Sequence, residues 1–139
     1  MGIKINQPVG PAWWAPLIIR IALGSYFTLA GLSKLEALSA FIRQVKGFGV
    51  LPDNVASLYA TLLPYGEVAI GLLLILGLWT TLIALLTSFL LLTFVCAFGV
   101  FPGDYDLFNK DLILLAASFS LMYSGPGGYS LDNVRKVPA

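Results

Sequence analysis

The stretch "TLLPYGEVAIGLLLILGL", from Thr61 to Leu78, is long and apolar enough to cross a membrane, yet it contains a proline and the ionisable residue Glu67. An apolar run of about 18 residues or more is typical of a transmembrane helix. A charged side chain inside such a helix is costly unless it faces a partner or a polar cavity. The stretch therefore predicts a membrane span whose glutamate is turned toward other protein groups.

The composition places the whole chain in a membrane. Of its 139 residues, 58% are hydrophobic and 11% are charged, and the mean hydropathy is +0.89. Soluble domains average about 25% charged residues. The net charge of +1 provides no basic surface for nucleic acid. With Cys96 as the single cysteine and no histidine, internal dithiol exchange, histidine-ligated haem and most zinc or copper sites are excluded.

Four apolar runs predict an all-α protein, a membrane-embedded antiparallel four-helix bundle that forms one domain over residues 1–139. The run over residues 59–101 would make a helix about 64 Å long, twice the hydrocarbon thickness, so it must contain two spans. Gly77, Trp79, Thr80 and Thr81 mark the turn between them. The predicted spans are residues 13–33, 59–78, 81–101 and 108–124.

The first apolar run has an alternative interpretation as a cleaved signal peptide, but Arg20 would interrupt its apolar region. Four spans place both termini on the same side of the membrane. The lysines and arginines are divided too evenly between the two sides to fix the orientation.

Residues 36–48 show a different pattern, in which apolar side chains recur at helical spacing and polar ones fall on the other side. This predicts a short amphipathic helix in the membrane interface, between spans one and two. The apolar positions are Leu38, Phe41, Ile42, Val45 and Phe48.

The ionisable residues of the apolar runs meet on one side of this arrangement. Lys34 ends span one, Glu67 lies about two turns into span two, and Lys110 and Asp111 open span four. Because neighbouring spans run in opposite directions, these four residues lie toward the same membrane face. The sequence predicts one polar cluster made of Arg20, Lys34, Glu67, Lys110 and Asp111.

Arg20 reaches this cluster from the opposite membrane side. If Trp13 and Tyr59 mark the membrane edges, the vertical gap between Arg20 and Glu67 is only about 8 Å. We therefore expect the two to pair, either as a purely structural ion pair or as part of a functional site. Arg20 shares one face of span one with Gly24, Phe27, Gly31 and Lys34.

Glu67 is the best candidate for a catalytic residue, with a role that the sequence leaves unknown. Intramembrane carboxylates commonly mark proton routes or ligand sites, and one beside lysines could bind or protonate a quinone head group. Lys34 and Lys110 have the alternative of extending to the membrane surface. The chain alone is expected to hold no cofactor other than a quinone.

No metal site is expected, because Asp104, Asp106 and Asp111 form only a loose acidic group. The segment "GPGG" at residues 125–128 lacks the lysine and hydroxyl of a phosphate-binding loop and predicts a helix end. Cys96 is expected to be a small buried residue.

Several motifs, in this order and spacing, resemble the DoxX family of small four-helix membrane proteins. The resemblance runs from about Pro16 to Asp132. It consists of Arg20 followed by "GLSK" at residues 31–34, "PYGEVAIG" at 64–71, "GLWT" at 77–80 and "GPGGYSLD" at 125–132.

The resemblance implies an integral membrane subunit, in a prokaryotic cytoplasmic membrane, that works with other oxidoreductase subunits. It implies no particular reaction and leaves open whether the chain is itself an enzyme. Two hypotheses follow. The chain is either a subunit of a quinone-linked oxidoreductase, in which Glu67 and its basic neighbours contact quinone, or a non-catalytic scaffold of a larger membrane complex.

Overall fold

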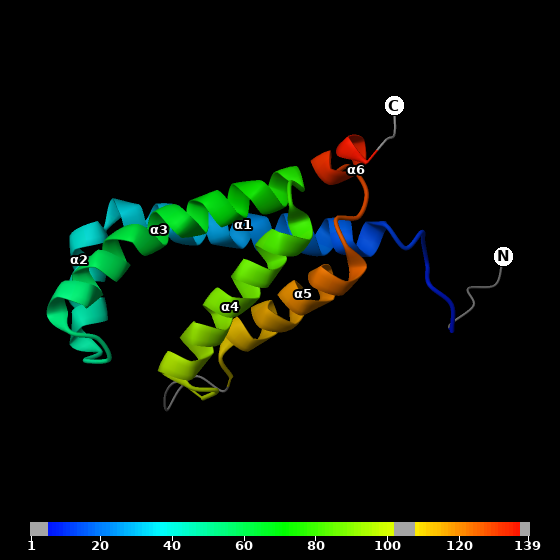
Figure 1. Ribbon diagram of the computed structural model, residues 1–139. Helices are drawn as coiled ribbons and strands as arrows, with labels where there is room; N and C mark the ends of the chain where they lie inside the picture. Colours follow the sequence, from blue (N-terminus) through cyan, green and yellow to red (C-terminus); the bar gives the residue numbers. More distant parts are fainter. Residues whose placement is uncertain (1–5, 102–107, 137–139) are drawn as a thin grey trace.

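The computed structural model describes residues 6–101 and 108–136, which form α-helices and no strand (Figure 1). The predicted all-α class is confirmed. The helices are α1 (Trp14–Glu36), α2 (Leu38–Gly47), α3 (Asp53–Leu76), α4 (Thr80–Phe98), α5 (Lys110–Ser124) and α6 (Leu131–Arg135).

Within the described residues, α1, α3 and α4 are long and apolar enough to cross a membrane. The chain is therefore an integral membrane protein, and its outward apolar faces contact lipid. The fourth predicted span corresponds to α5, whose 15 residues reach about 22 Å, less than the hydrocarbon thickness of about 30 Å. The fourth span, the bundle around it and the common side of the termini remain predictions.

The break between α3 and α4 lies where the sequence predicts it. Gly77 ends α3 in the left-handed region at φ 68°, and Trp79 precedes α4 at φ 49°. The second conformation is unfavourable for a bulky residue. It is held by Asp132, whose carboxylate accepts hydrogen bonds from the backbone amides of Trp79 (2.8 Å) and Thr80 (2.7 Å).

Helices α1 and α3 run side by side along the length of the molecule (Figure 1) and approach closely at glycines. A Cβ atom added to Gly24 would lie 2.8 Å from the carbonyl oxygen of Gly71. One added to Gly31 would lie 2.6 Å from the carbonyl oxygen of Pro64. Small residues allow helix backbones this close in a membrane, where packing rather than the hydrophobic effect drives association.

Helices α4 and α5 form a second pair, joined by buried serines. The Ser88 hydroxyl donates to the Ser118 oxygen (2.9 Å), and the Ser118 hydroxyl donates to the carbonyl of Ala84 (2.7 Å). Figure 1 shows α4 starting beside the end of α3 and diverging from it toward α2. We call the α6 end, where α3 and α4 meet, the closed end, and the α2 end, where their backbones lie apart, the open end.

The predicted amphipathic helix is confirmed as α2, at residues 38–47. Its apolar side chains Phe41 and Val45 face a cavity between the helices. Its basic residues Arg43 and Lys46 are exposed. The apolar side of α2 therefore covers part of the protein interior, which the sequence pattern alone does not distinguish from contact with lipid.

The close contact of α1 and α3 predicts a large effect for Gly71→Ala. The added methyl group would meet the carbonyl oxygen of Gly24 at 2.6 Å. We expect a loss of about 1–3 kcal/mol in the free energy of unfolding, which is typical of overpacking. The measurement is reversible unfolding in mixed detergent micelles, followed by tryptophan fluorescence.

Gly66→Ala in the same helix is the matched control. A Cβ atom at Gly66 meets nothing within 4 Å, so the substitution should gain up to about 1 kcal/mol of helix propensity. Equal stability of the two variants would show that the glycine contact does not hold the helices together.

Candidate functional site

The central contact of the site is an ion pair between α1 and α3. Lys34 Nζ lies 2.5 Å from Oε1 and 2.7 Å from Oε2 of Glu67. The Glu67 side chain is 2% exposed and that of Lys34 is 26% exposed. A buried carboxylate is costly without a partner, and this ammonium group supplies one.

Two aromatic rings complete the surroundings of the Lys34 ammonium group. Lys34 Nζ lies 5.4 Å from the ring centroid of Phe41 on α2 and 5.7 Å from that of Phe94 on α4. Aromatic faces attract cations at these distances. Side chains from α1, α2, α3 and α4 therefore meet at one ammonium group.

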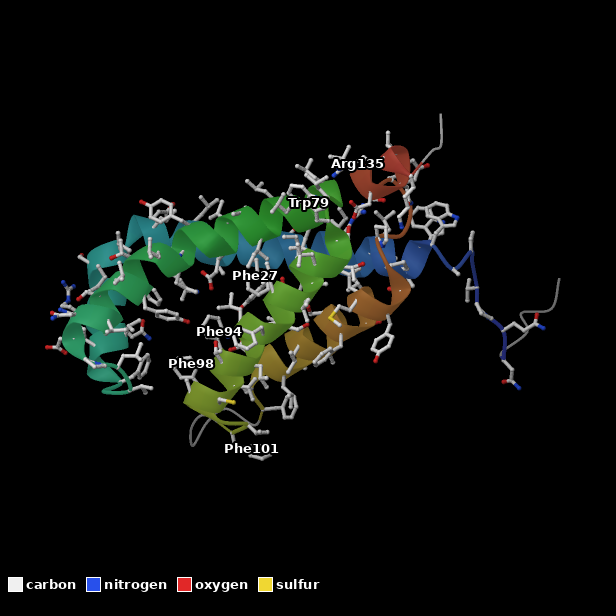
Figure 2. All side chains as sticks on the ribbon, in the orientation of Figure 1. Phe27, Trp79, Phe94, Phe98, Phe101 and Arg135 are labelled. Carbon is white, nitrogen blue, oxygen red and sulfur yellow. The ribbon has the colours of Figure 1, made fainter. Side chains whose placement is uncertain are left out.

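A cavity of about 610 Å³ lies beside the pair. In Figure 2, Phe94 and Phe98 extend from α4 into the space between α4 and the α2 and α3 side of the molecule. Its wall is mostly apolar, and the polar side chains in it are Tyr26, Ser33, Lys34, Gln44, Tyr59, Glu67, Thr93, Lys110 and Asp111.

A second charged pair from the start of α5 also borders the cavity. Lys110 Nζ lies 3.4 Å from Asp111 Oδ1, with side-chain exposures of 68% and 10%. Asn109 fixes this end of α5, since its Oδ1 accepts from the Asp111 amide (3.0 Å) and its Nδ2 donates to the carbonyl of Gly99 (2.8 Å). The two acids and two bases give the cavity wall no net charge.

The predicted pairing of Arg20 with Glu67 is wrong. The Arg20 side chain is buried at the opposite end of the molecule, where it holds the segment before α6. Its Nη1 donates to the carbonyl of Pro126 (2.9 Å), and its Nη2 donates to those of Gly128 (3.2 Å) and Tyr129 (2.9 Å). The cluster expected from the sequence thus contains Lys34, Glu67, Lys110 and Asp111, without Arg20.

The register of α1 against α3 explains this correction. Gly31 lies against Pro64, about one turn before Glu67, and against Val68, the residue after Glu67. Arg20 lies against Gly77. Its guanidinium group is so close that it would meet a Cβ atom added to that glycine. Arg20 is therefore level with Gly77 and not with Glu67, so the heights assumed from Trp13 and Tyr59 were wrong.

The pattern of the sequence did not assign Tyr59, Phe41 or Phe94 to the site around Lys34 and Glu67. Tyr59 and Leu63 precede Glu67 at intervals of four, so helical spacing could have placed them on its face. Phe41 and Phe94 carry no comparable signal, because only the tertiary packing brings α2 and α4 to Lys34. Cys96 is exposed, which corrects the expectation that it is buried.

Asp104 and Asp106, two of the three acids in the loose acidic group, lie outside the described residues. Among residues 6–101 and 108–136, no group of three or more histidine, cysteine or acidic side chains could hold a metal ion.

The ion pair predicts energetic coupling between Lys34 and Glu67. In a double-mutant cycle of Lys34→Met and Glu67→Gln, we expect a coupling free energy of about 0.5–3 kcal/mol, as is usual for residues in contact. A parallel cycle of Arg20→Gln and Glu67→Gln should be additive to within about 0.5 kcal/mol. Both are measured by unfolding in mixed micelles. Coupling in the second cycle alone would contradict the observed pairing.

Asp132 predicts a pH dependence of stability at the other end. Burial alone would raise its pKa, but hydrogen bonds from the Thr80 and Trp79 amides and the charge of Lys136 hold the pKa below its usual value. Because the folded pKa is the lower one, the carboxylate stabilises the fold above the unfolded pKa of about 3.9, and this stabilisation is lost as the pH falls through the folded pKa.

Asp132→Asn should therefore reduce the fall in unfolding temperature between neutral and acidic pH, measured by thermal unfolding in detergent. Asp53→Asn, which changes an exposed acid at the start of α3, is the control and should leave the pH profile closer to wild type. Equal profiles for Asp132→Asn and wild type would rule out this contribution.

Comparison with known proteins identifies the family. Residues 12–102, well over half of the chain, match the family described as methylamine utilisation protein MauE. The match includes Arg20, Lys34 and Glu67 and ends before Lys110. No curated protein and no solved structure matches the chain significantly. The family that matches is thus MauE and not DoxX, which the sequence motifs resemble. Both are families of small integral membrane proteins. The chain belongs to the MauE family of membrane proteins.

Proposed function

We propose that the chain is an accessory subunit of an oxidoreductase system, embedded in a prokaryotic cytoplasmic membrane, and that its cavity holds the head group of a quinone. Methylamine utilisation, from which the MauE family takes its description, is an oxidoreductase-linked system and supports the first part. The second part rests on the chemistry of the cavity wall.

The observation that carries the proposal is a cavity of about 610 Å³ with the Lys34–Glu67 pair in an otherwise mostly apolar wall. Pockets for small organic ligands typically have volumes of about 300–1,000 Å³, apolar walls and few polar groups. A quinone has the matching form, since its ring and tail are apolar and its polar atoms are two carbonyl oxygens.

The charges around the cavity favour a neutral ligand. Lys34 and Lys110 are balanced by Glu67 and Asp111, so an ionised ligand would bring an uncompensated charge into a poorly solvated site. Carbonyl oxygens accept hydrogen bonds, and the lysine ammonium groups and the hydroxyls of Tyr26 and Tyr59 are donors. A quinone fits these donors without adding charge.

In this proposal, a partner subunit supplies the electrons. Reduction of a quinone to a quinol consumes two electrons and two protons, and a chain with one cysteine and no histidine offers neither an internal dithiol nor a histidine-ligated metal to supply the electrons. The electrons come from the partner's redox centre. Protons come from solvent through Lys34 and Glu67, and a carboxyl group in the membrane is suited to that transfer.

The alternative is a non-catalytic scaffold, which one specific observation favours. Lys34 alone contacts side chains from three other helices, so it fixes how α1, α2, α3 and α4 meet. In this second proposal the pair sets the shape of the subunit, and the outer faces bind other subunits of the complex.

Glu67→Gln separates the two proposals, because it keeps the size and hydrogen-bonding capacity of the side chain but removes the exchangeable proton and the charge. A quinone site predicts a folded, assembled subunit with a loss of quinone-reductase activity of about 10²-fold or more, as for other proton-transfer groups. The measurement is activity per subunit recovered with its partners, together with quinone retained per subunit.

Glu36→Gln is the control, since Glu36 is exposed at the end of α1 and does not line the cavity. It should leave both the activity per assembled subunit and the quinone retained per subunit unchanged. Equal activity per assembled Glu67→Gln subunit would reject the proton-transfer role, and absence of quinone from the wild-type subunit would reject the quinone itself. Reduced assembly with unchanged activity per complex would favour the scaffold.

A further inference from the structure

A second hollow lies at the closed end of the molecule, where α6 meets the start of α4. Its volume is about 460 Å³. Figure 2 shows Trp79 and Arg135 at this end, far along the molecule from Phe98 at the open end. The hollow is lined by Trp79, Thr80, Thr81, Leu82, Pro126, Asp132, Arg135 and Lys136.

Two cations at this hollow are available to a ligand. The Arg135 guanidinium carbon lies 5.8 Å from the Trp79 ring centroid, so the ring holds the group while its N–H edges remain exposed. Lys136 is also exposed. Within residues 6–101 and 108–136, neither cation makes an ion pair with an acidic side chain.

The acid of the hollow is already engaged. Both carboxylate oxygens of Asp132 accept hydrogen bonds from backbone amides, those of Trp79 and Thr80. These bonds fix α6 to α4 and hold Arg135 and Lys136 in place. They also occupy the amides at the start of α4, so the attraction for an anion comes from the two basic side chains.

Aromatic residues place this end at the level of lipid head groups. Trp13 and Trp14 stack with ring centroids 4.7 Å apart, and Tyr129 meets Trp13 at 5.7 Å. Trp79, at the start of α4 and against Arg135 of α6, is 54% exposed. Tryptophan and tyrosine are enriched at membrane–water interfaces, where their polar edges reach water and their rings contact the acyl region.

An apolar strip leads away from the hollow along α4. It consists of outward side chains at helical spacing, three or four residues apart. They are Leu82 (53% exposed), Leu85 (50%), Phe89 (69%) and Leu92 (46%). A ligand with an anionic head at the hollow could lay a hydrocarbon chain along this strip, whereas a free anion would make no use of it.

We propose that this hollow binds an anionic phospholipid, with its phosphate group on Arg135 and Lys136 beside Trp79 and one acyl chain along α4. The bound lipid would hold α6 against the α3–α4 turn and so stabilise the closed end. This site is separate from the quinone cavity and independent of the proposed function.

The test uses the full chain purified in detergent and mixed with equal amounts of phosphatidylglycerol and phosphatidylcholine that carry identical acyl chains. Bound lipids are counted by native mass spectrometry. Wild type should retain phosphatidylglycerol in preference. The double variant Arg135→Gln/Lys136→Gln should bind it about 30-fold more weakly, and Arg135→Gln alone about fivefold more weakly, with phosphatidylcholine unchanged.

The matched control is Arg43→Gln/Lys46→Gln on α2, which removes two exposed charges from the opposite end. It should bind phosphatidylglycerol as wild type does. Equal loss in the two double variants would overturn the proposal, because attraction would then be general. Equal retention of both lipids would also overturn it, as would displacement of phosphatidylglycerol by the same concentration of inorganic phosphate. Unfolding temperatures in lipid-free detergent show whether the variants are folded. If the double variant Arg135→Gln/Lys136→Gln is not folded, the lipid binding of Arg135→Gln alone decides the test.

Discussion

The glycine contact between α1 and α3 fixes the antiparallel register on which both ends of the molecule depend. Gly24 lies against Gly71, and Gly31 lies against Pro64 and Val68, with too little space for a Cβ atom on either glycine of α1. A slip of one helical turn would press side chains into backbone. This register brings Lys34 to Glu67 and carries Arg20 to the level of Gly77. The buried charges therefore have their partners chosen by backbone packing.

The two buried charges, Arg20 and Glu67, have partners of different kinds at the two ends of the molecule. Arg20 has five N–H donors in a planar group, and it binds three backbone carbonyls of the segment before α6. Together with Asp132, which caps α4, it ties the C-terminal segment to the α3–α4 turn. Glu67 needs only one cation. Toward the α2 end, α4 diverges from α3 (Figure 1). The cavity of about 610 Å³ lies there, with the Lys34–Glu67 pair in its wall.

The helices could be predicted from the sequence because apolar run length and helical spacing are local properties. The turn near Gly77 and the amphipathic helix followed from such signals. The partner of Glu67 could not be predicted in this way. The height of Glu67 relative to Arg20 depends on where α3 begins and on the glycine register, and neither is a local property. The meeting of Phe41 and Phe94 at Lys34 likewise needs the tertiary packing. The DoxX resemblance rested on short motifs such as the arginine of the first span and the proline before Glu67, whereas the family that matches over residues 12–102 is MauE.

The difference in exposure between Lys34 and Glu67 sets the order in which a ligand would meet them. Both side chains line the cavity, but the lysine side chain is 26% exposed and that of the glutamate is 2% exposed, so a ligand from outside reaches the ammonium group more readily. A ligand that accepts hydrogen bonds can bind to Lys34 without breaking the ion pair, since an ammonium group has three donors. A cation would have to displace the lysine from both the carboxylate and the two rings. Binding of a hydrogen-bond acceptor at the third donor of Lys34 would therefore leave the buried carboxylate paired.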